Sequence, residues 1–415
     1  MHTNNLNIIV FEHETIRIDR INHRGQKLEA DCYKSLCAYY GDKGVPYFNL
    51  INNGIKFCEY VGVLQVGKYQ IEILPKADKA SGDRDELKWQ KVLIAMLKES
   101  GRFPIVAPSS SNLKLKRHSI LDLYFQLFVK EVKSIIHGGF VKKYCKVEQN
   151  LNSLKGRMLF DQHLRKNLVH AERFYTVSTS YSQNNIYNQI LFKALRLITS
   201  ISTTGVGDDA RQLQLFFLDI KDIKISEETF NRLKFDRKTE RYQPAIAIAR
   251  LLLLNFHPDL SNGRNHVLAL MFNMNFLWER YILSKLKKVA LGFPNLTISG
   301  QDTKEFWNGR KIRPDIVVRS KHTTVIIDTK WKAIREVEPS IQDLRQMYAY
   351  NHHFNSNRSI LLYPQDYDLL EMRESYSLPN LHLNHPEKNH SCEVVFVSVM
   401  DNERYFEDML NEVNK

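Results

Sequence analysis

The pattern of apolar and polar residues is clearest near the C-terminal end, where it predicts two neighbouring strands. Segments 311–319 and 323–332 are rich in Ile and Val, and a polar turn from Arg319 to His322 lies between them. Apolar runs that flank a short polar turn are typical of a β-hairpin. Pro314 suits the beginning or edge of a strand, because it has no N–H to donate to a neighbour. We therefore expect an antiparallel pair of strands here.

The rest of the C-terminal third alternates between helical and strand-like patterns. This alternation predicts an α/β domain over residues 261–415, because helices that follow strands cover the faces of a sheet. The expected helices are 265–289, 339–353 and 403–413, the expected strands are 295–300, 311–319, 323–332, 358–363 and 393–399, and a polar loop is expected at 364–391.

The first two thirds of the chain divide into a mixed region, 1–80, and a mainly helical region, 81–260. Gly67 and Lys68 separate two strand-like runs and indicate a hairpin with a two-residue turn. The expected strands are 7–11, 15–18, 57–66 and 69–74, the expected helices are 28–40, 87–99, 119–136 and several over 185–255 with a break at Gly205, and loops are expected at 77–86 and 104–112.

Three charged residues of the predicted C-terminal hairpin are expected to converge. Asp328 and Lys330 are two positions apart on one strand, so their side chains leave the same face, and hairpin pairing can bring Asp315 beside them. Carboxylates are hard oxygen ligands that suit Mg²⁺. The lysine can orient or deprotonate a water whose pKa the metal lowers. The alternative is a surface hairpin that carries ordinary charges.

The charge balance favours a polyanionic partner such as DNA. The chain of 415 residues has 59 Lys and Arg against 46 Asp and Glu, a formal net charge of +13. Part of this charge gathers at 141–173, where aromatic residues are interleaved. Such a segment either follows a phosphate backbone or holds domains together. A net charge of this size is also compatible with a basic surface that binds nothing.

Several sites and locations are disfavoured by the sequence. The five cysteines are scattered and form no Cys-x-x-Cys pair, which argues against a zinc site and for a reduced, cytoplasmic protein. No Gly-x4-Gly-Lys-Ser/Thr segment occurs, so we expect the chain to hydrolyse no nucleotide itself. The longest apolar run, 246–256, is too short to cross a bilayer, and we expect no membrane partner.

The residues around the C-terminal hairpin resemble the PD-(D/E)xK nuclease motif. Gln346-Met-Tyr-Ala-Tyr350 also resembles the Gln-x-x-x-Tyr element of the RecB-like branch of that superfamily. Glu279 lies before the first core strand, where many of these nucleases have a metal-supporting glutamate, although it could equally be a solvated helix residue. The resemblance implies catalysis by Asp315, Asp328, Lys330, Gln346 and Tyr350, and a metal site of Asp315, Asp328 and Glu279.

Four further segments resemble the McrC family, the nuclease subunits of modification-dependent restriction systems. The resemblance implies a separate McrB-like AAA+ partner that forms a hexameric ring, hydrolyses GTP and reads the modified base. It also implies that the N-terminal half of this chain docks on the ring and stimulates hydrolysis, with Gln65 to Lys76 facing the partner. The four segments are Ile71-Glu-Ile-Leu-Pro-Lys76, Leu154-Lys-Gly-Arg157, His163-Leu-Arg-Lys-Asn167 and Asn184-Asn-Ile-Tyr-Asn188.

Together these expectations describe the endonuclease subunit of a GTP-dependent complex directed at modified cytosine in DNA. We expect an α+β N-terminal region, a helical middle and a restriction-endonuclease-like C-terminal domain, with Mg²⁺ as cofactor and GTP used only through the partner. The tip of the hairpin 57–74 is expected to be free to enter that partner. Two alternatives are a stand-alone RecB-like repair nuclease and a non-catalytic activator of an AAA+ ring.

Overall fold

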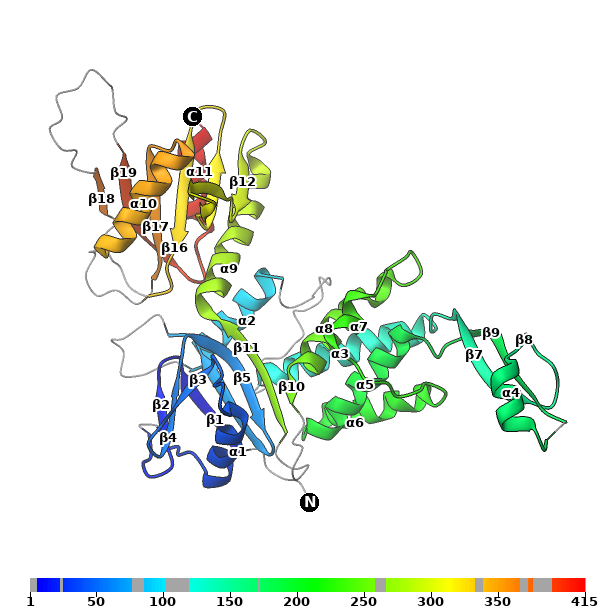
Figure 1. The fold of residues 1–415 in the computed structure, drawn as a ribbon. Coiled ribbons are helices and arrows are strands. Elements are labelled where there is room, and N and C mark those ends of the chain that lie inside the picture. The colour runs from blue at the N-terminus through cyan, green and yellow to red at the C-terminus, as the bar shows by residue number, and fades with distance from the viewer. Residues whose placement is uncertain are drawn as a thin grey trace. The chain divides into compact units, whose positions relative to one another are not determined.

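A computed structural model shows that the chain falls into two compact units, whose elements are labelled in Figure 1. The first unit comprises residues 1–6, 65–70 and 104–270, and the second comprises 7–64, 71–103 and 271–415. The two units group the chain differently from the three consecutive ranges 1–80, 81–260 and 261–415 expected from the sequence. As functional domains, those three ranges stay a prediction. The structure describes residues 6–22, 25–76, 86–101, 119–170, 172–257, 266–332, 339–365, 372–375 and 390–414.

Helices make up most of the first unit. α3 (Ile120–His137), α5 (Ile186–Ile201), α6 (Gly205–Gln214) and α8 (Gln243–Leu254) pack against one another and bury their apolar residues. Asn185 begins α5 as its N-cap, because its side-chain oxygen accepts backbone N–H groups of the first turn. The helical patterns expected at 119–136 and over 185–255 are confirmed, and the break at Gly205 is the start of α6.

The basic segment between α3 and α5 is a folded module, which we call the basic module (residues 143–182). Its strands β7 (Lys143–Leu151), β9 (Phe174–Ser182) and β8 (Arg157–Met158) form an antiparallel sheet, and α4 (Phe160–Asn167) contacts β9. Much of β7 is exposed, so the apolar alternation that would have predicted it is missing. The strands of this module were therefore missed in the sequence.

Buried hydrogen bonds join Val141, just before the basic module, to the helices. Val141 N donates to Tyr242 OH at 3.0 Å, and the Val141 carbonyl accepts from Asn185 Nδ2 at 2.8 Å. Tyr242 OH in turn donates to Asn188 Oδ1 at 2.9 Å. Because buried polar groups are costly to leave unpaired, this network fixes the chain where it leaves the helical bundle.

The N-terminal strands belong to two sheets. The larger sheet has the order β1 (Leu6–Phe11), β6 (Tyr69–Leu74), β5 (Tyr60–Val66), β11 (Val267–Asn273) and β10 (Phe256–His257). The smaller sheet has the order β2 (Thr15–Arg17), β4 (Gly54–Phe57) and β3 (Phe48–Ile51), and α1 (Ala30–Tyr40) contributes Tyr33 OH, which donates to Ile51 O. The mixed character expected for this region is confirmed.

The β5–β6 hairpin is an interior part of its sheet. Every residue of β6 is buried, and so is Val66 on the other side of the turn. Gly67 N donates a 3.0 Å hydrogen bond to His266 O, and Gln65 Nε2 donates to Gly67 O at 2.8 Å. Both strands have neighbours in the sheet, and at the turn Lys68 is exposed whereas Gly67 is hydrogen-bonded, so the entry of this tip into a partner stays a prediction.

The C-terminal part of the second unit is a six-stranded sheet with helices against it. Its order is β12 (Thr297–Gly300), β15 (Ile316–Arg319), β16 (Thr324–Thr329), β17 (Arg358–Gln365), β19 (Ser391–Ser398) and β18 (Met372–Ser375), with β16, β17 and β19 parallel. The helices are α9 (Met274–Val289), which packs on α2 (Glu86–Glu99), α10 (Ile341–Phe354) and α11 (Glu403–Asn414). Figure 1 shows α10 in front of β16 and β17, and its residues Met347 and Phe354 join the core of the sheet.

Three expected elements of this region are corrected. Residues 267–273 form strand β11 before α9 begins, because a short apolar run fits a buried strand as well as a helix. The strand expected at 311–319 is interrupted at Pro314, which separates β14 (Arg310–Ile312) from β15. β18 lies inside the expected loop 364–391, most of which is outside the described residues, as are 77–85 and 102–112.

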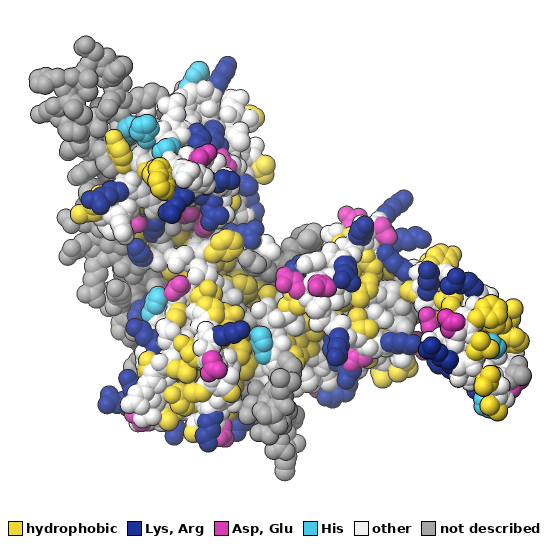
Figure 2. All heavy atoms as spheres, viewed as in Figure 1, with side chains coloured by type: hydrophobic (Ala, Val, Ile, Leu, Met, Phe, Trp, Pro, Cys, Tyr) yellow, Lys and Arg dark blue, Asp and Glu magenta, His cyan; other side chains and the backbone are white. Residues whose placement is uncertain are grey.

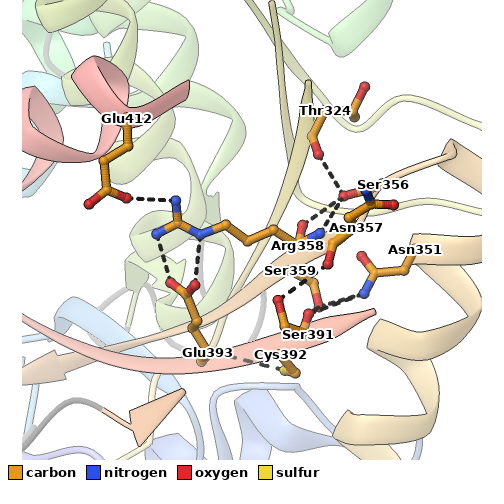
Figure 3. Close-up of polar contacts among 10 residues, drawn as sticks. All are labelled: Thr324, Asn351, Ser356, Asn357, Arg358, Ser359, Ser391, Cys392, Glu393 and Glu412. Carbon is orange, nitrogen blue, oxygen red and sulfur yellow. Dashed lines mark hydrogen bonds and ion pairs between the residues drawn. The ribbon is translucent and has the colours of Figure 1, made fainter. Parts of the chain in front are cut away.

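A polar network fixes the strand ends that lie opposite the pocket described below. Figure 3 shows Arg358, at the beginning of β17, between two carboxylates. Its Nε and Nη2 donate to Glu393 at 2.7 and 2.8 Å, and its Nη1 donates to Glu412 at 2.8 Å. Asn351 of α10 donates to Ser359 Oγ at 3.1 Å. The network ties α10 and α11 to β17 and β19, which stabilises the scaffold that positions the site.

Candidate active site

The carboxylates of the C-terminal hairpin converge at one end of the sheet. Ile316 of β15 pairs with Ile327 of β16 in an antiparallel register. Asp315, just before Ile316, and Asp328, just after Ile327, therefore lie side by side at the same end of the pair. Asp328 is 2% exposed, and the Asp315 side chain reaches across to the next residue of β16. The convergence expected from the sequence is confirmed, and burial of this degree excludes a surface hairpin with ordinary charges.

Asp315 is held in place by Thr329. One carboxylate oxygen, Oδ2, accepts hydrogen bonds from the Thr329 backbone N at 2.8 Å and from its hydroxyl at 2.9 Å. Burial and, next, the negative charge of Glu279 together raise the pKa of Asp315 to about 6, although the Thr329 hydrogen bonds act in the opposite direction. The ionised form of Asp315 is therefore poorly stabilised by the positive charge around it.

Asp328 and Lys330 form an ion pair within the pocket. Lys330 Nζ lies 2.7 Å from Asp328 Oδ2 and 3.3 Å from Asp343 Oδ1. Burial and the charge of Asp315 raise the pKa of Asp328 to about 6 despite this lysine. Burial lowers the pKa of Lys330, but the two neighbouring carboxylates outweigh it and the net shift is upward. Lys330 is therefore an ammonium group, which can orient a water or a phosphoryl oxygen but cannot accept a proton.

Residues of α10 complete a chain of hydrogen bonds. Gln346 Oε1 accepts from Lys330 Nζ at 3.3 Å, and Gln346 Nε2 donates to Tyr350 OH at 2.7 Å. Tyr350 OH donates to the Arg313 carbonyl at 3.0 Å. The Gln-x-x-x-Tyr spacing places both side chains on one helix face, directed at the lysine.

Asp343, which contacts Lys330 beside the pocket, was missed in the sequence. It lies three positions before Gln346 and seven before Tyr350, so all three share one face of α10. That spacing is the signal that could have identified it. The Asp343 N–H also donates to the side chain of Ser340, the N-cap of the helix, at 3.1 Å.

Glu279 lies on α9 and lines the same pocket. It is 8% exposed, which rules out the alternative of a solvated helix residue. Its Oε1 accepts a 2.8 Å hydrogen bond from Gln301 Nε2. Burial raises the pKa of Glu279, although Gln301 lowers it. The pocket has a volume of about 520 Å³ and is lined by Asn273, Asn275, Phe276, Glu279, Gln301, Arg313, Asp315, Asp328, Thr329, Lys330, Gln346 and Tyr350.

The donor set fits a magnesium ion held by two carboxylates. Across the residues that the structure describes, no three acidic, His or Cys side chains form a ready-made metal cage. Mg²⁺ is usually bound through one or two carboxylates, with waters and substrate phosphates completing the octahedron. Asp328 Oδ2 is buried and, apart from its ion pair with Lys330, accepts no hydrogen bond from the described residues. Asp315 and Asp328 therefore suit the ion, whereas Glu279 stays a predicted third ligand.

The scaffold and its pocket define a mixed α/β protein with a buried carboxylate–lysine site. The chain belongs to the family described as the McrBC 5-methylcytosine restriction system component, whose model matches residues 55–364. The expected relationship to the McrC family is thus confirmed. No protein among the curated sequences compared matches this chain.

Solved structures match the chain at low sequence identity. It is similar to the McrC subunit in a half-complex from a tetradecameric assembly of Thermococcus gammatolerans McrB AAA+ hexamers with bound McrC, with 21% identity, 98% of this chain and 100% of that chain covered, and a TM-score of 0.68. A structure of the Thermococcus gammatolerans McrBC complex matches with 22% identity, 68% and 88% coverage and a TM-score of 0.48, which supports no argument. The first match shows the fold alone.

No helix within the described ranges has both the length and the apolar character needed to cross a bilayer.

Proposed function

We propose that this chain is the endonuclease subunit of a GTP-dependent restriction complex that cleaves DNA containing modified cytosine. The observation that carries the proposal is the convergence of Asp315, Asp328 and Lys330 in one pocket. Two hard carboxylates beside an ammonium group suit the hydrolysis of a phosphodiester with a divalent metal. The family, which is named for a 5-methylcytosine restriction system, is consistent with DNA as the substrate.

Each pocket residue has a distinct task in this proposal. Asp315 and Asp328 would hold Mg²⁺, and the ion would supply positive charge for the phosphoryl oxygens and lower the pKa of a water. The Lys330 ammonium orients a water or neutralises charge on the phosphoryl group, and Asp328 and Asp343 keep the lysine protonated. Gln346 and Tyr350 are positioning residues, because they act through Lys330 and the backbone of Arg313. Glu279 would be the third ligand of the metal.

The proposed partner is a McrB-like AAA+ ring. The structure similar to this chain contains McrB AAA+ hexamers with bound McrC. The present chain has no phosphate-cradling Gly-x4-Gly-Lys-Ser/Thr segment of its own, so GTP would be hydrolysed by the partner. We infer that this chain stimulates that hydrolysis and that the ring supplies the reading of the modified base.

The basic module is the surface that best suits this protein partner. Figure 2 shows hydrophobic and basic side chains side by side on the part of the surface that Figure 1 labels β7, β8, β9 and α4. Apolar side chains of the module are exposed where a globular domain would bury them, at Leu154 (60%), Phe160 (68%), Leu164 (58%), Leu168 (80%) and Val169 (86%). Clustered exposed apolar residues mark protein interaction sites. The module is therefore the ring contact that we propose, in addition to the predicted segment from Gln65 to Lys76.

Cleavage and GTP turnover assays separate this proposal from its alternatives. The assay measures the cutting of duplex DNA, with and without 5-methylcytosine, in Mg²⁺ and GTP, with and without the cognate AAA+ protein. Asp328→Ala is expected to reduce cutting by about 1000-fold or more while stimulation of GTP turnover persists. Lys321→Ala, an exposed change in the turn at the far end of the β15–β16 pair, is the control.

Three results would redirect the assignment. Cutting by Asp328→Ala at the wild-type rate would remove the pocket from the chemistry. Wild-type cutting that is equally fast without the AAA+ protein would favour a stand-alone repair nuclease. Stimulated GTP turnover without any DNA cleavage by the wild-type chain would favour a non-catalytic activator.

A further inference from the structure

A short hairpin next to the pocket carries the most exposed tryptophan of the described chain. This site hairpin consists of β13 (Lys304–Trp307) and β14 (Arg310–Ile312). Trp307 is 63% exposed and Phe306 is 51% exposed. The other three tryptophans, Trp89, Trp278 and Trp331, are 5%, 0% and 7% exposed. Large aromatic rings are normally buried or placed where they contact a partner, so this exposure calls for an explanation.

The site hairpin is pre-organised. Asn308 and Gly309 have φ of 42° and 78°, the combination that a two-residue hairpin turn with matching twist requires. Gly309 N donates to Glu305 Oε1 at 2.9 Å, which holds the turn closed. The Phe306 ring lies 5.2 Å from that of His353 on α10, and Lys304 Nζ donates to the His353 carbonyl at 2.8 Å. A partner would therefore meet a surface that is already ordered.

The backbone connects this surface directly to the pocket. Arg313 follows β14, and both Arg313 and Asp315 line the pocket. Three residues span at most about 11 Å, so Arg310 lies within that distance of Arg313 at the Cα atoms. Trp307 is the cross-strand partner of Arg310. The Cα atoms of such a pair are about 5 Å apart, so Trp307 lies only this much further from Arg313. One turn of duplex DNA measures about 34 Å, so a duplex with its scissile phosphate at Asp315 reaches the site hairpin within one turn.

The chemistry of the site hairpin is complementary to DNA. Lys304, Arg310 and Lys311 are exposed on it, against one acidic residue, Glu305. The guanidinium carbon of Arg310 lies 5.6 Å from the centre of the Trp307 ring, so an aromatic face and a cation are presented together. Lysine and arginine contact phosphates, whereas aromatic side chains contact sugars and bases. A protein partner is less well matched, because the central part of a protein interface is depleted of lysine.

We propose that the site hairpin binds the DNA duplex beside the scissile phosphate, with Trp307 against sugars and base edges in a groove and Lys311 on a flanking phosphate. This inference rests on the proposed nuclease function and assigns the DNA contact of that same site. The contact would position the backbone over Asp315 without taking part in the reaction. β-hairpins and two-stranded ribbons enter DNA grooves in several classes of binding protein.

Tryptophan fluorescence provides a direct test, because three of the four indoles are buried. The full-length Asp328→Ala chain is used so that DNA stays intact, and a 30-base-pair duplex is added. Quenching of the emission by acrylamide is expected to decrease at least about twofold when DNA binds, because Trp307 becomes shielded. The Trp307→Phe variant is expected to show little quenching with or without DNA.

Affinity measurements provide the second arm. Trp307→Ala is expected to weaken duplex binding about tenfold, and Trp307→Phe is expected to restore part of the loss, since base and sugar contacts with one aromatic ring contribute on this scale. Lys311→Ala is expected to weaken binding and to reduce the slope of log affinity against log salt by about 1. Lys321→Ala, with the same change of charge on an equally exposed residue, is the matched control and is expected to change neither quantity.

The outcomes separate this inference from the proposed function. Unchanged acrylamide quenching on DNA binding, together with wild-type affinity of Trp307→Ala, overturns the contact even if Asp328 is required for cutting. Shielding of Trp307 by the AAA+ protein instead of by DNA also overturns it and assigns the surface to a protein. If the wild-type chain cuts no DNA under any condition, the proposed function fails independently of the binding result.

Discussion

Trp331 Nε1 donates a 2.7 Å hydrogen bond to Glu12 Oε1, although the two residues are 319 positions apart in the chain. The same oxygen accepts from the Lys76 N–H at 2.7 Å. Trp331 directly follows Lys330, so the contact ties the N-terminal strands to the segment that carries the pocket. Burial raises the pKa of Glu12 to about 7, although the hydrogen bond from Trp331 lowers it.

This buried carboxyl predicts a loss of stability as pH rises through neutrality. The folded-state pKa of about 7 lies above the ordinary glutamate value of 4.5 in the unfolded chain, so the folded chain binds more protons between these pH values. The contribution is fully present below pH 4.5 and is lost as pH rises through 7. It amounts to about 3 kcal/mol in total, of which about 1 kcal/mol falls between pH 6 and pH 8.5.

Glu12→Gln tests this prediction, because the amide oxygen can keep both hydrogen bonds. The measurement is the free energy of unfolding in urea at pH 6 and pH 8.5 for both proteins. The wild-type chain is expected to lose more stability than the variant over this interval. Equal losses would show that Glu12 does not titrate differently in the folded and unfolded states.

Magnesium is expected to stabilise the chain against heat in the absence of DNA. A divalent ion between Asp315 and Asp328 would offset the burial and the charge repulsion that raise the pKa of both groups. At ten times its dissociation constant, a ligand specific for the folded state adds about 1.4 kcal/mol. The melting temperature should therefore rise with Mg²⁺ in the wild-type chain and not in Asp315→Asn. A rise of the same size in both proteins would place magnesium elsewhere.

Tyr350→Phe is expected to reduce the rate of cleavage about 10- to 100-fold. The variant keeps the ring in the core but removes the hydroxyl that links Gln346 to the Arg313 carbonyl. Loss of an orienting partner typically has an effect of this size. Single-turnover cleavage should slow while DNA affinity stays the same. An affinity loss with an unchanged rate would instead indicate that the hydroxyl binds substrate.

Leu168→Ser is expected to reduce stimulation of GTP turnover by the AAA+ protein at least fivefold. Leu168 is 80% exposed beside α4, so the substitution removes an apolar contact surface without affecting the core. Leu218→Ser in the same unit is the matched control, since that leucine is 83% exposed. GTP hydrolysis is measured at increasing concentrations of each chain. A similar effect of both variants would argue against the basic module as the docking surface.

The candidate site could be predicted largely because its parts are local in sequence. Asp315, Asp328 and Lys330 lie on one hairpin, and an antiparallel pair brings them together whatever the rest of the chain does. Gln346 and Tyr350 are about one helical turn apart, so the sequence also predicted that they share one face of the helix. Asp343 was missed although it belongs to the same face, because an acidic residue near the beginning of a helix is common for electrostatic reasons alone.

The larger sheet could not be predicted in the same way. β5 and β11 are neighbours in it, but about 200 residues separate them, and no short-range pattern indicates which distant strand pairs with which. The hydrogen bond between the β5–β6 turn and His266 could not be predicted either, because the two residues are far apart in the sequence. The strands of the basic module lacked apolar alternation, so composition showed only their charge.

The position of β11 in that sheet has a consequence for how the protein is made. Ribosomes add roughly 5–20 residues per second, so β5 emerges roughly 10–40 s before its neighbour β11. During this interval one edge of β5 has no partner strand, and unpaired edges readily join strands of other chains. A nascent or truncated chain that ends before residue 267 is therefore exposed to aggregation. Production of the N-terminal half alone would need residues 267–273 supplied, for example as a fused strand.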